Sequence, residues 1–167
     1  DNPVGKVAYF QFNGTSYDSL EVAKFTGLNR PLHFLTYDFD QDGYQDFVVS
    51  ETGDQAGRLT LYAGTKSGSY DRKVLVEEPG FGKGYLRDLN ADGRMDFVCV
   101  QGAARNSVQA FYNLDGRNFV RSWLMALAPH QHVADFDLVD LDGDSHEEMI
   151  VTVGKKGRNL RVNGNRN

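Results

Sequence analysis

The stretch Asp38-Phe39-Asp40-Gln41-Asp42-Gly43-Tyr44-Gln45-Asp46 carries acids at positions 1, 3, 5 and 9, and it leads into the apolar run Phe47-Val48-Val49. Two related stretches follow it, Asp88-Leu89-Asn90-Ala91-Asp92-Gly93-Arg94-Met95-Asp96 and Asp140-Leu141-Asp142-Gly143-Asp144-Ser145-His146-Glu147-Glu148. Their first residues are 50 and 52 positions apart along the chain. Because a fixed period of this size marks repeated supersecondary units, the sequence predicts a repeat architecture.

The spacing of the acids indicates a cation site in each copy. Oxygen ligands at positions 1, 3 and 5 converge if the backbone curls around one point, and position 7 can add its carbonyl. Ca²⁺ suits such a loop because it accepts about 6–8 oxygens in flexible geometry, whereas Mg²⁺ prefers a stricter octahedron. Without a cation, two carboxylates ~4 Å apart repel each other by about 1 to 4 kcal/mol. A solvated acidic loop explains one such run, but three runs in the same frame favour a metal site.

The loop differs from an EF-hand, which closes its shell with a Glu at position 12 between two helices. Here the closing acid stands at position 9, and β-branched or aromatic residues follow it, which predicts a strand. Position 12 is apolar in all three copies: Val49, Cys99 and Val151.

The third copy departs from the other two at its turn. Position 6 is Gly43 and Gly93 in the first two copies but Ser145 in the third. A residue other than glycine in a left-handed conformation costs roughly 1 kcal/mol or more, so we expect the third site to be the least regular. Gly143 at position 4 offers another place for the chain to turn.

The pattern resembles the FG-GAP repeat, also called the VCBS repeat, found in calcium-binding β-propellers such as the integrin α-subunit head. Phe81-Gly82 precedes the second loop and Gly102-Ala103 follows its strand, although Ala104 stands where the family name has proline. The resemblance implies an all-β propeller in which each loop joins the first two strands of a blade and holds Ca²⁺, up to three ions per chain. The implied ligands are Asp38, Asp40, Asp42, the Tyr44 carbonyl and Asp46; Asp88, Asn90, Asp92, the Arg94 carbonyl and Asp96; and Asp140, Asp142, Asp144, the His146 carbonyl and Glu148.

Turn residues and alternating apolar residues predict blades of four antiparallel strands. Blade 1 covers residues 28–78 and blade 2 covers 79–128, within a single module over 1–167. Residues 1–27 supply two late strands of a split blade, and 129–167 supply its early strands. The expected strands are 6–12, 17–25, 32–37, 46–50, 58–63, 70–76, 81–87, 96–101, 107–113, 118–127, 132–137 and 148–153, with a weak one at 159–162. Phe119 and Trp123 are expected in the core between blades, and the alternative for Trp123 is an exposed position that stacks on a sugar.

Three blades' worth of strands fall short of the four to eight blades of known propellers. We therefore expect two chains to pair head to tail into a six-bladed ring in which each donates strands to the other. The alternative is a fragment of a longer propeller. Unpaired edges at both ends would otherwise invite uncontrolled association.

Composition narrows the function. Eleven of the 23 acids occupy proposed ligand positions, and leaving them out changes the formal charge from −5 to +6, so the acidity belongs to the loops. No Gly-x-Ser-x-Gly, Walker or dinucleotide motif is present, and no basic stripe interleaved with aromatic residues suggests nucleic acid. Carboxylates that hold Ca²⁺ are poor proton donors, so we do not expect an enzyme. No apolar run is long enough to cross a membrane.

The sequence predicts a secreted or cell-surface binding module with structural calcium, since weak calcium sites fill at extracellular concentrations. Its ligand is expected to be a glycan or a protein, and the aromatic content of 12% slightly favours carbohydrate. Cell adhesion is the corresponding role for a protein ligand. The alternative is an accessory part of a larger polysaccharide-acting enzyme or adhesin.

Overall fold

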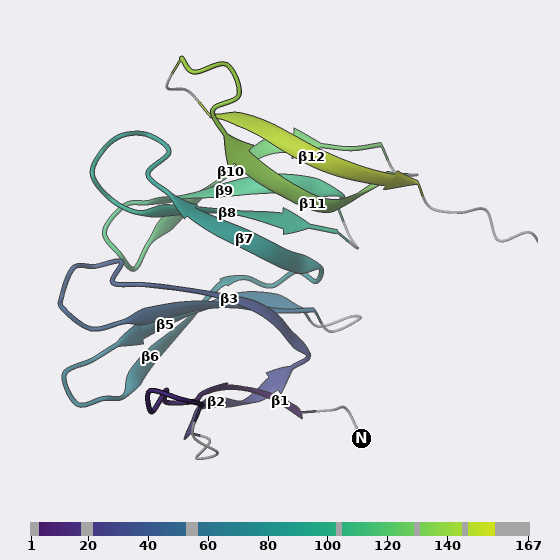
Figure 1. Ribbon diagram of the computed structural model, residues 1–167. Coiled ribbons are helices and arrows are strands. Elements are labelled where there is room, and N and C mark those ends of the chain that lie inside the picture. The colour runs from purple at the N-terminus through teal and green to yellow at the C-terminus, as the bar shows by residue number, and fades with distance from the viewer. Residues whose placement is uncertain are drawn as a thin grey trace, which may run out of the picture.

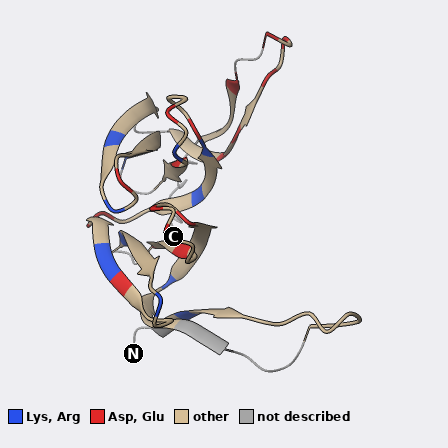
Figure 2. Cartoon of the chain, turned by 90° about the vertical axis from the view of Figure 1, so that its left-hand side faces the viewer, with Lys and Arg blue, Asp and Glu red and all other residues tan. Residues whose placement is uncertain are grey.

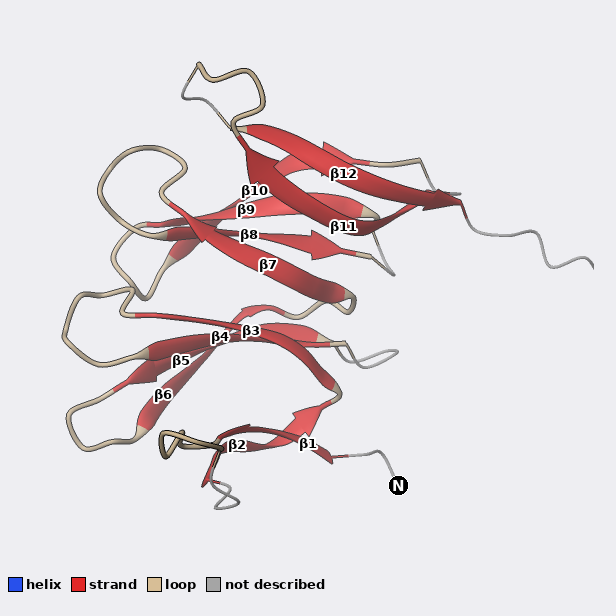
Figure 3. Cartoon of the chain, in the orientation of Figure 1, coloured by secondary structure: helices blue, strands red, loops and turns tan. Residues whose placement is uncertain are grey.

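The computed structural model describes residues 4–17, 22–52, 57–102, 105–128, 131–144 and 147–155 of the chain. All regular elements in these ranges are β-strands, as Figure 3 shows. The strands are β1 (Val4–Tyr9), β2 (Val22–Asn29), β3 (Pro31–Tyr37), β4 (Asp46–Glu51), β5 (Arg58–Gly64), β6 (Tyr70–Val76), β7 (Phe81–Arg87), β8 (Asp96–Gln101), β9 (Ser107–Asn113), β10 (Phe119–Ala126), β11 (Gln131–Val139) and β12 (Glu148–Lys155).

The strands form four antiparallel sheets. Two sheets have four strands in chain order, β3-β4-β5-β6 and β7-β8-β9-β10, and two have a single hairpin, β1-β2 and β11-β12. The sheets stack face to face in chain order, with the β1-β2 hairpin at one end and the β11-β12 hairpin at the other (Figure 1). The predicted all-β class and the predicted antiparallel strand order are therefore confirmed.

Local sequence explains where the chain turns. Gly14 and Gly116 lie in the hairpin turns at Asn13-Gly14 and Asp115-Gly116, with φ of 99° and 82°. Asn13 closes its turn by accepting the amides of Thr15 and Ser16 at 3.1 and 3.0 Å. The expected weak strand at 159–162 lies outside the described residues.

Three apolar cores join neighbouring sheets. Successive side chains of a strand point to opposite faces, so each four-stranded sheet contributes to two cores. Val48 packs toward β7-β10, whereas Val49 packs toward β1-β2. Phe97 packs in the core between the two four-stranded sheets, whereas Val98 packs in the core toward β11-β12. The fully buried residues of the central core include Leu61, Phe81, Phe97 and Phe111.

One expectation about the core is wrong. Phe119 packs on the central core as expected, but Trp123 is 46% exposed. Trp123 stands on β10 beside a register shift, and none of the described strands pairs with the outer edge of β10. Arg105 and Arg121 lie over its ring instead, at 5.3 and 5.2 Å from its centroid.

A polar network holds the end of the β7-β10 sheet. Arg121 donates two hydrogen bonds to Glu78 at 3.1 and 3.0 Å, and the buried Gln101 donates a third at 3.0 Å. The hydrogen bonds from Arg121 lower the pKa of Glu78 to about 2. The network therefore fixes the segment between the two four-stranded sheets with an ionised carboxylate.

The three acidic loops all lie along one edge of the stack, at the left of Figure 1. Figure 2 looks onto this edge and marks the Asp and Glu positions of the backbone in red, together with the two terminal hairpins, whose ends protrude from the stack. Within the described ranges, no helix is long and apolar enough to cross a membrane.

Candidate metal centre

The first loop, between β3 and β4, is curled by its own acids. Asp38 accepts the amides of Asp42 and Gly43 at 3.0 and 2.9 Å, and Asp42 accepts the amide of Tyr44 at 2.9 Å. These short-range bonds draw the backbone around the carboxylates. The loop is therefore held in a curled form by bonds that need no ion.

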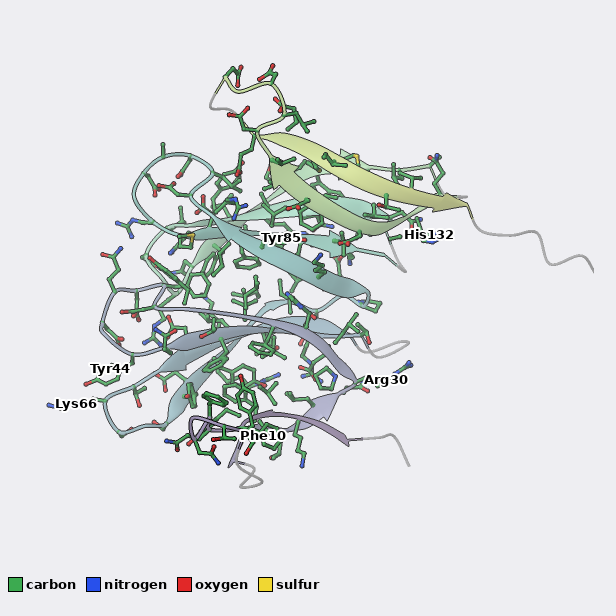
Figure 4. All side chains as sticks on the ribbon, in the orientation of Figure 1. Phe10, Arg30, Tyr44, Lys66, Tyr85 and His132 are labelled. Atoms are coloured by element: carbon green, nitrogen blue, oxygen red, sulfur yellow. The ribbon has the colours of Figure 1, made fainter. Side chains whose placement is uncertain are left out.

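This curl brings three predicted ligands together. Asp38, Asp40 and Asp42 each offer a carboxylate oxygen, and these oxygens lie within 4.8 Å of one another. Such convergence costs Coulomb energy unless a cation neutralises it. The donor set is oxygen only, which is the set that Ca²⁺ prefers, so the residues present fit this ion. Tyr44 points outward from the loop (Figure 4), and its carbonyl stays a predicted ligand.

The second loop, between β7 and β8, repeats this bonding. Asp88 accepts the amides of Asp92 and Gly93 at 3.2 and 2.9 Å, and Asp92 accepts the amide of Arg94 at 2.8 Å. Asn90 takes the place of an acid, and its side-chain amide donates to Asp92 at 2.9 Å. The loop thus has the backbone of the first loop with one negative charge fewer.

The third loop, between β11 and β12, is built differently. Oxygens of Asp140, Asp142 and Glu148 lie within 4.8 Å of one another, and that group does not include Asp144. Gly143 donates its amide to Asp140 at 2.6 Å, a bond made by position 6 in the other loops. The predicted ligand His146 and the unusual Ser145 lie outside the described residues.

The closing acids of the first two loops also act as struts, which here means that each carboxylate accepts one amide from its loop and one from the third strand of its sheet. Asp46 is fully buried and accepts the amides of Phe39 and Gly64 at 2.9 and 2.8 Å, one on each oxygen. Gly64 ends β5, which is the third strand of the sheet. The Asp46 carboxylate therefore joins the loop between β3 and β4 to β5. Burial raises the pKa of Asp46 because desolvation disfavours its charge. Its oxygens do not belong to the 4.8 Å group formed by the other three acids of that loop.

Asp96 repeats this arrangement in the second sheet. It is fully buried and accepts the amides of Leu89 and Asn113 at 3.0 and 2.7 Å. Burial likewise raises its pKa. Glu148 in the third loop accepts the amide of Leu141 at 2.8 Å, and among the described residues it accepts no second amide. The position-9 acid therefore receives the amide of position 2 in all three loops.

The turn at position 6 follows the sequence prediction, but a second turn at position 4 was expected only in the third loop, at Gly143, and was missed in the first two. Gly43 and Gly93 have φ of 89° and 83°. Position 4 is left-handed as well, with φ of 59° at Gln41, 56° at Ala91 and 80° at Gly143. Gly143 was the signal for this second turn, because only the third copy places glycine there.

Sequence reasoning also missed a link between the first loop and the next sheet. Arg117, in the turn between β9 and β10, donates to Asp40 at 2.8 Å, and Asn113 donates to the Phe39 carbonyl at 3.0 Å. Gly116 lies so close that a Cβ there would overlap the backbone of Asp40. The first loop is thus hydrogen-bonded to the β7-β10 sheet as well as to its own sheet.

A family model described as an FG-GAP-like repeat matches residues 88–151. Residues 88–151 are similar to an FG-GAP-like repeat. The match begins at the first acid of the second loop and ends in β12, so the resemblance expected from the loops is confirmed there. No curated protein and no solved structure matches the chain. The first loop lies outside the matched segment but shares the hydrogen bonding of the second.

Proposed function

We propose that the chain is a calcium-binding, non-catalytic binding module of the β-propeller type. The convergence of three carboxylates within 4.8 Å, seen in the first loop and again in the third, carries this proposal. The two four-stranded antiparallel sheets correspond to blades, and the two hairpins correspond to parts of a blade. The ions have a structural role, since they neutralise loops that already link neighbouring strands. Millimolar calcium outside cells would fill such sites, so the proposed location is extracellular.

Calcium titration tests the metal assignment. Asp42→Ala removes a carboxylate from the first cluster, so the variant is expected to bind one ion fewer per chain by calorimetry. At 100 times the dissociation constant, one site stabilises the fold by about 2.7 kcal/mol, so the thermal midpoint in calcium should fall accordingly. In chelator the two proteins should melt alike, because Asp42 is exposed and holds only a local turn.

Glu77→Gln is the matched control, because Glu77 is an exposed acid outside the three loops. It should leave both the number of bound ions and the calcium-dependent midpoint unchanged. Equal calcium binding by Asp42→Ala and Glu77→Gln would reject the assignment of the first loop.

A groove of about 790 Å³ between β2 and the β5-β6 edge supports a glycan as the ligand. Tyr70 supplies a partly exposed aromatic ring and Arg72 supplies hydrogen-bond donors, whereas Phe25 and Tyr62 line the floor of the groove as buried core residues. Glu51 lines the groove at 1% exposure. Its Oε1 accepts no hydrogen bond from the described residues, although Arg58 Nε lies 3.3 Å from it. One partly exposed aromatic ring beside polar groups suits a sugar, with its apolar faces and hydroxyl rim.

A glycan array followed by calorimetry tests the groove. Arg72→Ala is expected to weaken binding of the best glycan at least tenfold, equivalent to about 1.4 kcal/mol. Trp123→Ala removes an exposed aromatic residue outside the groove and should leave the affinity unchanged. Glycan binding that is weakened by Trp123→Ala instead would place the ligand on β10. If no glycan on the array binds, a protein becomes the favoured class of ligand.

A further inference from the structure

We propose that two copies of this chain exchange hairpins, so that β11-β12 of one copy and β1-β2 of the other form one four-stranded sheet. This inference does not rest on calcium binding. It rests on three observations: the position of each hairpin within the repeat, the second amide that Glu148 lacks among the described residues, and the exposure of aromatic residues that are buried elsewhere in the repeat.

The β11-β12 hairpin is the first half of a sheet. It flanks an acidic loop, as β3-β4 and β7-β8 do, and Glu148 accepts the position-2 amide as Asp46 and Asp96 do. Among the described residues, no strand pairs with the outer edge of β12, where the third strand of a complete sheet would lie.

The β1-β2 hairpin is the second half of a sheet. In the complete sheets, the residue after the last pair of the third and fourth strands donates its amide across the turn: Thr65 to Ser69 and Leu114 to Asn118, at 3.1 and 2.9 Å. Asn13 donates to Ser16 in the same way at 3.0 Å, directly after the bridge between Phe12 and Tyr17. Phe12 therefore corresponds to the residues that end β5 and β9.

This correspondence supplies the missing donor. Gly64 and Asn113, which end β5 and β9, point their amides away from the fourth strand and donate to Asp46 and Asp96. The amide of Phe12 points to the open edge of β1 for the same reason, because its bridge to Tyr17 is of the type without direct hydrogen bonds. In the exchanged sheet, Phe12 of one copy donates to Glu148 of the other, and the third loop gains the strut that the first two possess.

The exposed side chains point to the same sheet. Phe97, Phe111 and Phe119 form an aromatic cluster between the two complete sheets, with centroids 4.7 Å apart for Phe97 and Phe111 and 5.3 Å apart for Phe97 and Phe119. Counting from the closing acid and from the turn, the corresponding residues are Met149, Phe10 and Tyr17. Phe111 is 1% exposed, whereas Phe10 is 50% and Tyr17 is 69% exposed.

Phe10 lies on the hairpin at the end of the stack in Figure 4, on the layer farthest from β12. Among the described residues, the two edges therefore lie in layers at opposite ends of the stack. A second copy supplies both halves at once, because each copy carries one β12 edge and one β1 edge. Two exchanged sheets and four complete sheets give a ring of six, which lies within the size range of closed propellers.

The register follows from the complete sheets. Phe47 pairs with Tyr62 and Phe97 pairs with Phe111, each one residue beyond the closing acid. The same offset pairs Met149 of one copy with Phe10 of the other, and it therefore pairs the neighbouring residues Ile150 and Tyr9. Antiparallel partners lie about 4.5 to 5.5 Å apart between Cα atoms, within the range that a disulfide spans.

Cysteine pairing tests the register. The double variant Tyr9→Cys with Ile150→Cys is expected to oxidise to a covalent dimer of twice the 18.7 kDa chain mass, with or without calcium. Tyr9→Cys with Val153→Cys is the control, because Val153 is also exposed on β12 but lies three residues, about 10 Å, out of register. Cys99 does not interfere, since burial raises the pKa of its thiol.

Light scattering tests the association itself. The parent chain should have twice the monomer mass, and Phe10→Asp should restore the monomer because it places a charge in the exchanged core. Trp123→Asp, at another exposed aromatic residue, should remain a dimer. A monomeric parent, a dimer that survives Phe10→Asp, or equal cross-linking in both registers would each overturn the exchange. A failed calcium titration would leave these measurements unaffected, so the two proposals fail separately.

Discussion

Replacing Asp96 by alanine is expected to lower the free energy of unfolding by about 4 kcal/mol, because it leaves two amides of the buried loop junction without an acceptor. One of them, the amide of Asn113, is buried, and the other, the amide of Leu89, is partly buried. Each orphaned donor costs about 1 to 3 kcal/mol, and water cannot reach the first without opening the sheet. Urea unfolding monitored by fluorescence and circular dichroism measures the loss.

Two comparisons sharpen this prediction. Asp96→Asn keeps one carbonyl oxygen and therefore one acceptor, so about half of the loss should remain. The effect should persist in chelator, since the strut bonds are made without an ion, whereas Asp42→Ala should matter only in calcium. If Asp96→Ala were as stable as the parent in chelator, the carboxylate would not be a strut.

Gly116→Ala should have the second large effect, a loss of about 3 kcal/mol of unfolding free energy. Its φ of 82° is strained for any residue with a Cβ, which accounts for about 1 kcal/mol. The rest arises from overlap of the new methyl group with the backbone of Asp40. Because the displaced loop backbone belongs to Asp40, calorimetry should also show weaker calcium binding in the first loop.

Gly68 offers a matched control in the corresponding turn of the preceding sheet. Its φ is 79°, but a Cβ there would meet no atom within 4 Å. Gly68→Ala should therefore lose only about 1 kcal/mol and leave calcium binding intact. Equal losses at Gly68 and Gly116 would show that backbone strain, and not the contact of Gly116 with the first loop, dominates the loss of stability.

The strands could be predicted because their causes are local. Alternation of apolar residues and the glycine turns fixed the predicted strands within a few residues of β3 to β10. The acids could be assigned to loops because three copies shared one frame. The left-handed conformation of Gln41 and Ala91 was missed because nothing in either residue type announces it.

Features that depend on distant parts of the chain were beyond sequence reasoning. The pairing of Arg117 with Asp40 joins residues 77 positions apart, and no periodicity connects them. The exposure of Trp123 depends on which strand ends a sheet, not on its apolar character. The groove beside Glu51 likewise arises only when β2 is placed against β5 and β6.

Each of the three apolar cores is shared by two adjacent sheets, which gives the molecule the mechanics of a linear array. Its stability is then a sum of nearest-neighbour terms. A defect in the central core cuts the array into two short halves, each left with a single interface. A defect under either terminal hairpin peels away one layer and leaves the remaining two interfaces to act as before.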